Sequence, residues 1–392
     1  MLVVLVTVFL DMIGFGVVLP QLPIFIKDMG GTPRTVGILF TCFAAAQLVA
    51  TPILGRLSDQ YGRRKVIVFS LAGNAFSMIV FAVATEIKLL PLLFVSRIVA
   101  GATAGNLSAC QAAIADVTDR DQRAQGMGRI GAGIGLGLVF GPVLGGLVST
   151  LGDSAPPLAS ALLALAALCL AVVLMPETRR AGAPGAARPR RTAGALVGAL
   201  TDRRFAPLLA LYFFTFIALS TMQVALALLV KERFDWGKTE IGYLFGLLGL
   251  STVIIQGGLI GRLTRAFGEL NLMQFGAVMI CAGMLLIGLA GQPWHIIAGI
   301  ASFGIGIGVT NPSVSSLASR FAPADQQGAM LGVAQSAGGL ARTVGPTCAG
   351  FLYASFGSSA PFKGGAIAAG LSLLVGLYLK TVADDQDSIT SE

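Results

Sequence analysis

The sequence predicts an all-α polytopic membrane protein in which twelve spanning helices form two pseudo-symmetric six-helix bundles around a central cavity. Three observations lead to this prediction: the composition, the spacing of the apolar runs and an internal repeat. Of the 392 residues, 55% are hydrophobic and only 12% are charged, whereas soluble domains carry roughly 25% charged residues. This composition is typical of a helical protein that crosses the membrane many times.

Each expected helix is a mostly apolar run of about 20 residues, the length needed to cross a bilayer. The first run has neither a basic leader nor a small-residue cleavage site, so we expect a spanning helix rather than a cleaved signal sequence. In chain order the runs are 2–26, 34–54, 66–85, 91–115, 125–150, 157–176, 205–230, 239–260, 270–290, 294–318, 328–354 and 361–380.

One connection is long: residues 177–204 are rich in proline, glycine, alanine and arginine. We expect a cytoplasmic linker there, between an N-terminal bundle (1–176) and a C-terminal bundle (205–380), with a cytoplasmic tail (381–392). Placing both termini in the cytoplasm puts 18 of the 27 lysines and arginines on that side and 7 outside, as the positive-inside rule requires. This distribution predicts a multi-pass protein of the cell (inner) membrane, and it explains the basic charge without a nucleic-acid partner.

The two bundles are expected to be repeats of one unit. A shift of 204 residues aligns DQRAQGMG (121–128) with DQQGAMLG (325–332), and a shift of 206 aligns GRLSDQYGR (55–63) with GRLTRAFGE (261–269). Parallel repeats of this kind are typical of transporters whose two bundles rock around a central site.

Residues 55–65, GRLSDQYGRRK, place a group of charges between two apolar runs. Gly55 and Gly62 permit a tight turn at the cytoplasmic surface. The segment resembles the pattern G-x-L-x-D-x-x-G-R-[RK] between the second and third helices of the major facilitator superfamily (MFS). This resemblance implies an MFS fold.

The resemblance also implies that this turn is a conformational latch. Asp59 is then expected to meet the N-terminus of the 328–354 run, while Arg63, followed by Arg64, bridges Asp59 and Asp116. The alternative is an ordinary surface turn whose exposed ion pairs contribute about 0–1 kcal/mol.

The second copy of this turn reverses the charges. Arg265 stands opposite Asp59, and Glu269 stands opposite Arg63. We therefore expect a local pair between Arg265 and Glu269, and no acid that caps a helix N-terminus as Asp59 does.

Asp11 is the one acid deep within an apolar run, VLVTVFLDMIGFGVVLP. Placing a charge there costs about 2.5–3.5 kcal/mol on insertion scales, so such residues usually have a function. We expect Asp11 to bind and release a proton within the membrane; the alternative is a carboxylate that supports a helix broken near Pro20. The segment DMIGFGVVLPQLP resembles the opening helix of tetracycline-exporter-type drug:proton antiporters of the MFS, which carry an acid at this place.

Arg97 is a second charge inside a span. From the ends of their runs, Arg97 lies about 10 Å below the outer surface and Asp11 about 15 Å above the inner one, in a core of about 30 Å. The two side chains are therefore candidates for a coupled pair, although Arg97 can instead snorkel outward or bind backbone carbonyls. Arg97 followed by Gly101 also resembles an MFS motif linked to proton transfer.

The segment GLVFGPVLGG (137–146) combines a proline with small residues inside a span. Proline removes a backbone hydrogen bond, and glycines admit close helix packing. The segment resembles the MFS antiporter motif g-x-x-x-G-P-x-x-G-G, which points to exporters; the alternative is a generic packing seam. The matched residues are Gly137, Gly141, Pro142, Gly145 and Gly146.

Arg342 is a third charge inside a span, and it either binds an anionic substrate or bonds backbone loosened near Gly345 and Pro346. Further side chains inside the spans are candidates to line a substrate cavity, each equally able to hydrogen-bond between helices or, for the phenylalanine, to face lipid. They are Phe15, Gln47, Asn106, Gln223, Asn311 and Gln335.

Together these residues predict a secondary transporter, without enzymatic activity, metal or cofactor, that exports small amphiphilic compounds in exchange for protons. Its partners are then the substrate, protons and the bilayer, and the protein is expected to be a monomer. The alternative is an organic-anion or nutrient carrier, working by uptake or facilitation, in which Arg97 and Arg342 hold a carboxylate. A membrane-embedded enzyme or a receptor is disfavoured, because no nucleophile–base or metal constellation accompanies the repeat.

Overall fold

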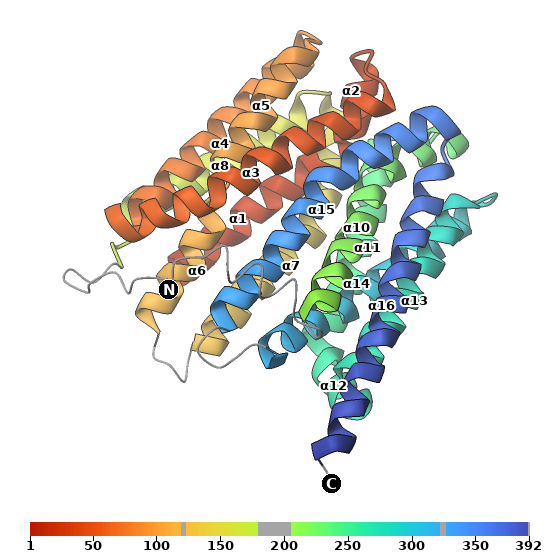
Figure 1. The fold of residues 1–392 in the computed structure, drawn as a ribbon. Coiled ribbons are helices and arrows are strands. Elements are labelled where there is room, and N and C mark those ends of the chain that lie inside the picture. Colours follow the sequence, from red (N-terminus) through yellow and green to blue (C-terminus); the bar gives the residue numbers. More distant parts are fainter. Residues whose placement is uncertain (119–122, 179–204, 322–326, 391–392) are drawn as a thin grey trace. The chain divides into compact units, whose positions relative to one another are not determined.

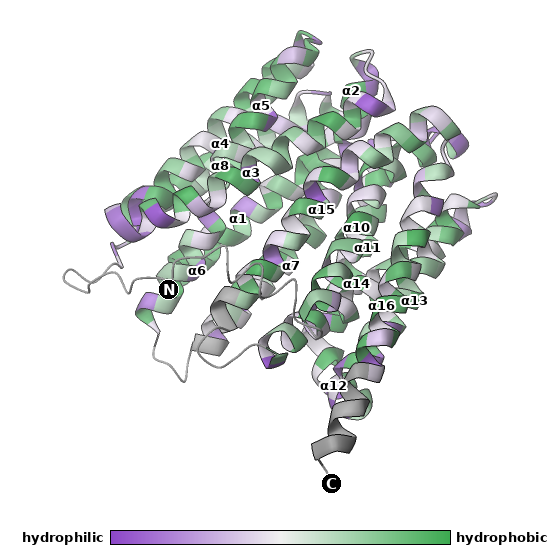
Figure 2. Cartoon of the chain, in the orientation of Figure 1, coloured by the Kyte–Doolittle hydropathy of each residue, from purple (hydrophilic) through white to green (hydrophobic). Residues whose placement is uncertain are grey.

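The structure, a computed structural model, describes residues 1–118, 123–178, 205–321 and 327–390, and in these ranges every regular element is helical (Figure 1). Eleven of the helical segments in these ranges are long and apolar enough to cross a membrane. Figure 2 shows apolar residues along most of the length of the helices, with hydrophilic residues gathered toward helix ends. The predicted class of all-α membrane protein is confirmed.

The first half of the chain supplies the elements that surround Asp11. They are α1 (Leu2–Val18), the short 3-10 helix η1 (Leu19–Gln21), α2 (Leu22–Asp28), α3 (Pro33–Tyr61), α4 (Arg63–Glu86), α5 (Leu90–Ala102), α6 (Asn106–Val117), α7 (Arg123–Val148), η2 (Ser149–Leu151) and α8 (Ala155–Leu174).

The second half supplies eight further elements. They are α10 (Phe205–Phe234), α11 (Lys238–Ile254), the π-helical turn η3 (Ile255–Leu259), α12 (Ile260–Phe267), α13 (Glu269–Gly288), α14 (Pro293–Phe321), α15 (Gln327–Phe356) and α16 (Ala360–Thr390).

Two expected spans of the first half are interrupted. The first becomes α1 and α2, joined by η1, where Pro20 cannot donate a backbone hydrogen bond. The fourth breaks after Ala102, and α6 begins at Asn106. The break in the fourth span has no proline, and the sequence carries no local signal that predicts it.

The turn expected over residues 55–65 is much shorter than predicted. α3 runs on to Tyr61 and α4 begins at Arg63, so Gly62 alone makes the turn, with φ of 108°. Gly55 lies inside α3 with open space around it. The charges of this segment therefore project from two helix ends rather than from a loop.

The chain forms two compact units, residues 1–186 with 227–249 and residues 187–226 with 250–392. The predicted bundle boundaries stay a prediction, and residues 179–204 of the expected linker lie outside the described residues. In the first unit α1 packs against both α7 and α8, while α4 packs against α5 and α8. α1 is therefore enclosed by other helices, and this places Asp11 in the interior.

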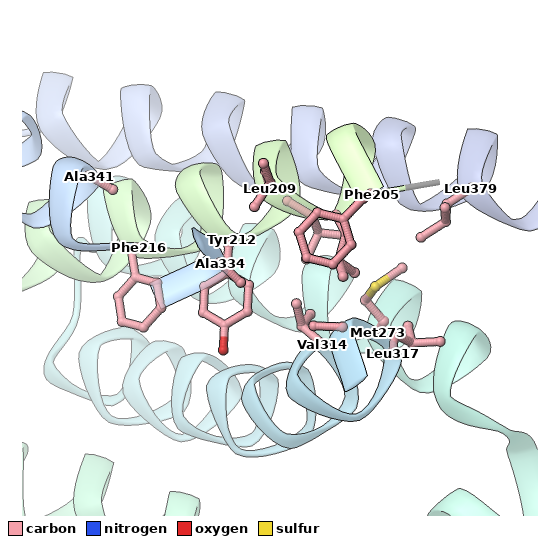
Figure 3. Packing of buried hydrophobic residues seen from close by; sticks show 13 residues of the cluster. Phe205, Leu209, Tyr212, Phe216, Met273, Val314, Leu317, Ala334, Ala341 and Leu379 are labelled. Carbon is pink, nitrogen blue, oxygen red and sulfur yellow. The ribbon is translucent and has the colours of Figure 1, made fainter. Parts of the chain in front are cut away.

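The second unit has its own apolar core, which Figure 3 shows from close by. Phe205, Leu209, Tyr212 and Phe216 project from successive turns of α10 toward side chains of α13, α14, α15 and α16. The side chains of Tyr212 and Phe216 stack, with ring centroids 5.7 Å apart. One face of α10 is thus an aromatic ridge against α14 and α15.

Candidate functional site

Asp11 lies on α1 with only 6% of its surface exposed. Its carboxylate accepts two hydrogen bonds, from Asn74 Nδ2 at 2.9 Å and from Asn106 Nδ2 at 2.6 Å. Each oxygen of the carboxylate is bound by one amide, so both amides donate to the charged form. Asp11 is thus held by neutral groups from two other helices, α4 and α6.

The break in the fourth span positions one of these amides. Asn106 is the first residue of α6, and its side chain reaches Asp11 from the N-terminal end of that helix. The close packing of the break depends on two glycines. A Cβ at Gly73 on α4 would clash with Thr103, and a Cβ at Gly105 would clash with Leu54. The interrupted helix therefore places a polar helix end, rather than an apolar helix flank, beside the buried acid.

Arg97 lies on α5 and is 5% exposed. Its guanidinium carbon stands 4.7 Å from the centroid of the Phe81 ring, and Nη2 lies 3.4 Å from the sulfur of Met78. Phe15, one turn along α1 from Asp11, lines a small apolar pocket together with Arg97, Phe40 and Phe43 among others. No ion pair joins Asp11 and Arg97 among the described residues, so a coupled pair of the two stays a prediction.

The glycine-rich segment of α7 packs directly on α1. A Cβ on Gly16 of α1 would lie 2.9 Å from Pro142 Cδ and 3.1 Å from Gly141 Cα. Gly137 and Gly145 face the same helix, at Met12 and Val17. α7 continues as a helix through Pro142. The backbones of α1 and α7 therefore touch along the segment that follows Asp11.

Gly146 of the same segment faces α11 instead. A Cβ there would lie 3.0 Å from the carbonyl oxygen of Thr239, whose hydroxyl donates to the carbonyl of Gly146 at 3.0 Å. On α11, a Cβ at Gly242 would lie even closer, 2.5 Å from the carbonyl oxygen of Pro142. The segment thus joins α1 on one side to the first turns of α11 on the other.

The charged residues around Gly62 form one network. Arg63 donates through Nε to Asp116 at 3.0 Å and through Nη1 to Asp59, with Ser58 also in reach at 3.2 Å. Arg64 donates to the carbonyl of Val172 on α8. The bridge from Arg63 to both acids is present; the expected capping of the 328–354 run by Asp59 joins the two units and stays a prediction.

The comparisons with known proteins agree with this geometry. The Major Facilitator Superfamily matches residues 4–346 and again 208–391. The chain belongs to the Major Facilitator Superfamily. The second match starts near the beginning of the second half, as expected for an internal repeat.

Three relatives cover almost the whole chain. The class C tetracycline resistance protein of Escherichia coli is 33% identical over 92% of this chain and 91% of its own length. The class H tetracycline resistance protein of Pasteurella multocida is 29% identical over 90% of this chain and 88% of its own. The crystal structure of the human organic anion transporter MFSD10 (TETRAN) is 26% identical, with a TM-score of 0.70, over 96% of this chain and 98% of that one.

These matches make the protein a membrane transporter that resembles tetracycline exporters, and not an enzyme. The expected fold of twelve spans is consistent with the eleven apolar helices and α15, which has 30 residues and is less apolar. The role of each candidate residue in this superfamily member remains a prediction.

The candidates for a substrate cavity are spread over both units. In the first unit Asn106 is bound to Asp11, while Gln47 is half-buried on α3. In the second unit Gln223 and Asn311 are half-buried, and Gln335 is exposed on α15. The structure therefore gives one of them, Asn106, a specific partner.

Arg342 is exposed near the middle of α15. Its guanidinium carbon lies 4.8 Å from the centroid of the Phe216 ring on α10. Among the described residues it forms no ion pair and no hydrogen bond.

Three further groups were missed by sequence reasoning. Asn74 could have been recognised from the sequence, since it is the one amide side chain in the apolar run 66–85. Glu177 was read as part of the linker, yet its carboxylate accepts a hydrogen bond from the Arg63 backbone N–H at 2.8 Å. No local pattern connects residues so far apart in the chain, so only the fold reveals this contact.

Lys238, at the start of α11, is the third. Its ammonium lies 2.6 Å from Asp153 and 3.4 Å from Asp28, and 4.2 Å from the centroid of the Phe25 ring. Only 12% of its side chain is exposed. Through Asp28, this cluster lies near the N-terminus of α3, and the Arg63 network lies at the C-terminus of the same helix.

Proposed function

We propose that the protein is a proton-coupled exporter that moves small amphiphilic or drug-like compounds out of the cell by alternating access. Asp11 takes up a proton when the central cavity is open to the outside and releases it when the cavity is open to the cytoplasm. The names of the tetracycline resistance proteins support the substrate class. The membrane potential contributes about 2.3 kcal/mol per transported charge per 100 mV.

One observation carries the proposal: the partners of the buried Asp11 are the neutral amides of Asn74 and Asn106. A lysine or arginine bonded to the carboxylate would hold it in the charged form. An asparagine serves both forms, because its NH₂ donates to a carboxylate and its oxygen, after rotation of the amide, accepts from a protonated acid. This arrangement suits a group that has to gain and lose a proton in every cycle.

The proposal includes an orientation. The basic linker supports an orientation with both termini on the cytoplasmic side of a cell (inner) membrane, the Arg63 network on that side and Lys238 outside. The latch proposed for Asp59 then holds the cytoplasmic side closed while the cavity is open to the outside. A monomer is sufficient for this cycle, and its partners are the substrate, protons and lipid.

The test measures transport in proteoliposomes of purified full-length protein, with tetracycline and ethidium as separate probes and an imposed pH difference. Asp11→Asn is expected to abolish transport driven by the pH difference while exchange of labelled for unlabelled compound at equal pH continues. The matched control is Asp235→Asn, because Asp235 is an exposed acid paired with Lys231 at the end of α10.

Retained pH-driven transport in Asp11→Asn would refute the role of Asp11. Proton-independent uptake by the wild-type protein would refute the antiport itself and favour the carrier for organic anions or nutrients. Loss of transport in Asp235→Asn would show that removing any acid suffices, and would also count against the specific role.

A further inference from the structure

We infer that Arg342, Phe216 and Tyr212 form a subsite for an anionic aromatic group of the transported compound. This inference names a substrate class for the proposed transport function and rests on it. It concerns the second unit alone, where α10, α14 and α15 bring the three side chains together.

The first step is the position of Arg342 along its helix. It is the sixteenth of the 30 residues of α15, so it lies about 22 Å from the start of that helix at a rise of about 1.5 Å per residue. An exposed charge at this depth cannot face lipid without a cost of about 2.5–3.5 kcal/mol or more. The exposed face of α15 at Arg342 must therefore border protein or a water-filled cavity.

The composition of α15 agrees with this placement. Gln335, seven residues and so about two turns before Arg342, is also exposed on this helix. α15 is less apolar than the eleven described helical segments that are apolar enough to cross a membrane. A polar face that includes Gln335 and Arg342 is expected of a helix that lines a cavity.

The second step is the aromatic base under the guanidinium. Phe216 and Tyr212 stack with an interplanar angle of 14°, and the guanidinium lies on the Phe216 ring. Tyr212 is fixed from the other side by a hydrogen bond between its hydroxyl and Ser315 Oγ at 2.8 Å. In Figure 3 the two rings lie side by side, and Ala341, the residue before Arg342, belongs to the same apolar cluster as Phe216.

Gly338 permits this arrangement. It stands one turn before Arg342, and a Cβ at this position would lie 2.9 Å from Phe216 Cδ2 and 3.5 Å from Tyr212 Cδ1. Any larger residue would push the rings away from α15. The sequence therefore builds a rigid aromatic surface beneath one arginine.

The third step is chemical. An arginine presents five N–H donors in a planar fork that matches a carboxylate or sulfonate, and the described residues use none of these donors for Arg342. The contact with Phe216 holds the plane of the guanidinium without consuming its donors. A compound with an anionic group attached to a flat ring would bind the fork and extend over the aromatic surface.

The test uses two matched probes, tritiated 2-naphthoate and tritiated 2-naphthamide, which share the ring and differ in charge. Binding to the purified full-length protein is measured by equilibrium dialysis at neutral pH, with no pH gradient. Wild-type protein is expected to prefer naphthoate. Arg342→Gln is expected to weaken naphthoate binding at least about tenfold, the effect of losing a charge-assisted pair, and to leave naphthamide binding unchanged.

Arg342→Lys keeps the charge and loses the planar fork, so we expect an intermediate affinity for naphthoate. The control replaces an arginine outside the subsite. Arg320→Gln removes an exposed arginine that is paired with Glu269. This variant is expected to bind naphthoate as the wild type does, and monodisperse elution of each variant shows that it is folded.

Unchanged naphthoate binding in Arg342→Gln, or absence of a preference in the wild type, would overturn the inference. An equal loss of both probes would do so as well, because the site would then not recognise charge. Failure of the proton coupling would leave these binding results intact, since no gradient is used. Conversely, the binding result does not decide whether Asp11 couples transport to protons.

Discussion

The two copies of the repeated turn build the same bridge with opposite charges. In the first unit Arg63, at the start of α4, reaches Asp116 near the end of α6. In the second unit Glu269, at the start of α13, reaches Arg320 near the end of α14. The repeat thus conserves an ion pair between corresponding helix ends while exchanging which end carries the base.

The two bridges differ in their surroundings. Arg63 is bound by Asp59 and Asp116, its side chain is 14% exposed, and Glu177 accepts its backbone N–H. In the second bridge Arg320 is 69% exposed and Glu269 is 13% exposed, and Glu269 accepts one further bond, from Ser316 at 2.7 Å. The first bridge joins three charged side chains around a partly buried arginine, whereas the second is a single pair whose arginine is exposed, so substitutions of the arginine are expected to matter more in the first.

The largest difference is expected at the two turn glycines. Gly62 has φ of 108° and Gly268 has φ of 73°, and both lie in regions that side chains avoid, at about 1–3 kcal/mol each. At Gly62 a Cβ would also run into the Glu177 carboxylate, whereas Gly268 has open space. We expect Gly62→Ala to lower the free energy of unfolding by about 3 kcal/mol and Gly268→Ala by about 1–2 kcal/mol, measured by denaturant titration in mixed micelles. Equal losses of unfolding free energy in the two variants would refute the expected clash with Glu177.

The next largest difference in unfolding free energy is expected when the two charges of each bridge are exchanged. Arg63→Asp combined with Asp116→Arg would set a new carboxylate against Asp59, and we expect a loss of about 2–3 kcal/mol in unfolding free energy. Glu269→Arg combined with Arg320→Glu restores the bridge in the polarity of the first unit, at a cost of about 1 kcal/mol or less. If both exchanges are tolerated equally, the first bridge is not a network.

Single neutral substitutions compare the two arginines directly. Arg63→Gln leaves two acids without their cation, and we expect a loss of about 1–2 kcal/mol, whereas Arg320→Gln is expected to cost less than about 0.5 kcal/mol. Thermal unfolding followed by tryptophan fluorescence would rank the variants. A larger shift for Arg320→Gln would contradict the ranking by burial.

A smaller effect than that of Arg63→Gln is expected for Glu177, which acts as a distant cap for α4. Gly62 is the N-cap residue of that helix and has no side chain to cap it, and the Glu177 carboxylate accepts the Arg63 N–H instead. Glu177→Ala is expected to cost about 1 kcal/mol, the usual loss for a missing cap. Hydrogen exchange at the first turn of α4 should rise, while exchange at the first turn of α13 serves as the internal reference.

Much of this architecture was predictable because a bilayer imposes it. Apolar runs of spanning length, a repeat at nearly constant shift and charged turns between spans gave the class and the repeat. The extent of the 55–65 turn was wrong, because charged residues also end a helix that leaves the membrane and only Gly62 needs an unusual backbone angle. The expected pair of Arg265 with Glu269 is also absent among the described residues: Arg265 donates to the carbonyl of Gly261, and Glu269 turns to α14.

The sequence predicted the acid of the candidate site, Asp11, but not the side chains that bind it. Asp11 was conspicuous because its cost in an apolar run is large. Placing a neutral amide such as Asn74 or Asn106 in an apolar span costs much less free energy than placing a carboxylate. Each therefore resembled any other amide in a helix until the fold placed it at the Asp11 carboxylate. Arg97 and Arg342 were equivalent as isolated charges in the sequence, whereas the structure buries the first and exposes the second.

The interruption of the fourth span has a consequence for how robust the acid's environment is. The opening turn of α6, which begins at Asn106, has main-chain N–H groups that lack helical acceptors and give that end a partial positive charge. This part of the electrostatic setting comes from the polypeptide itself, so it persists when any one side chain is exchanged. Evolution can therefore vary the amides around Asp11 without removing all the polarity that a buried carboxylate requires.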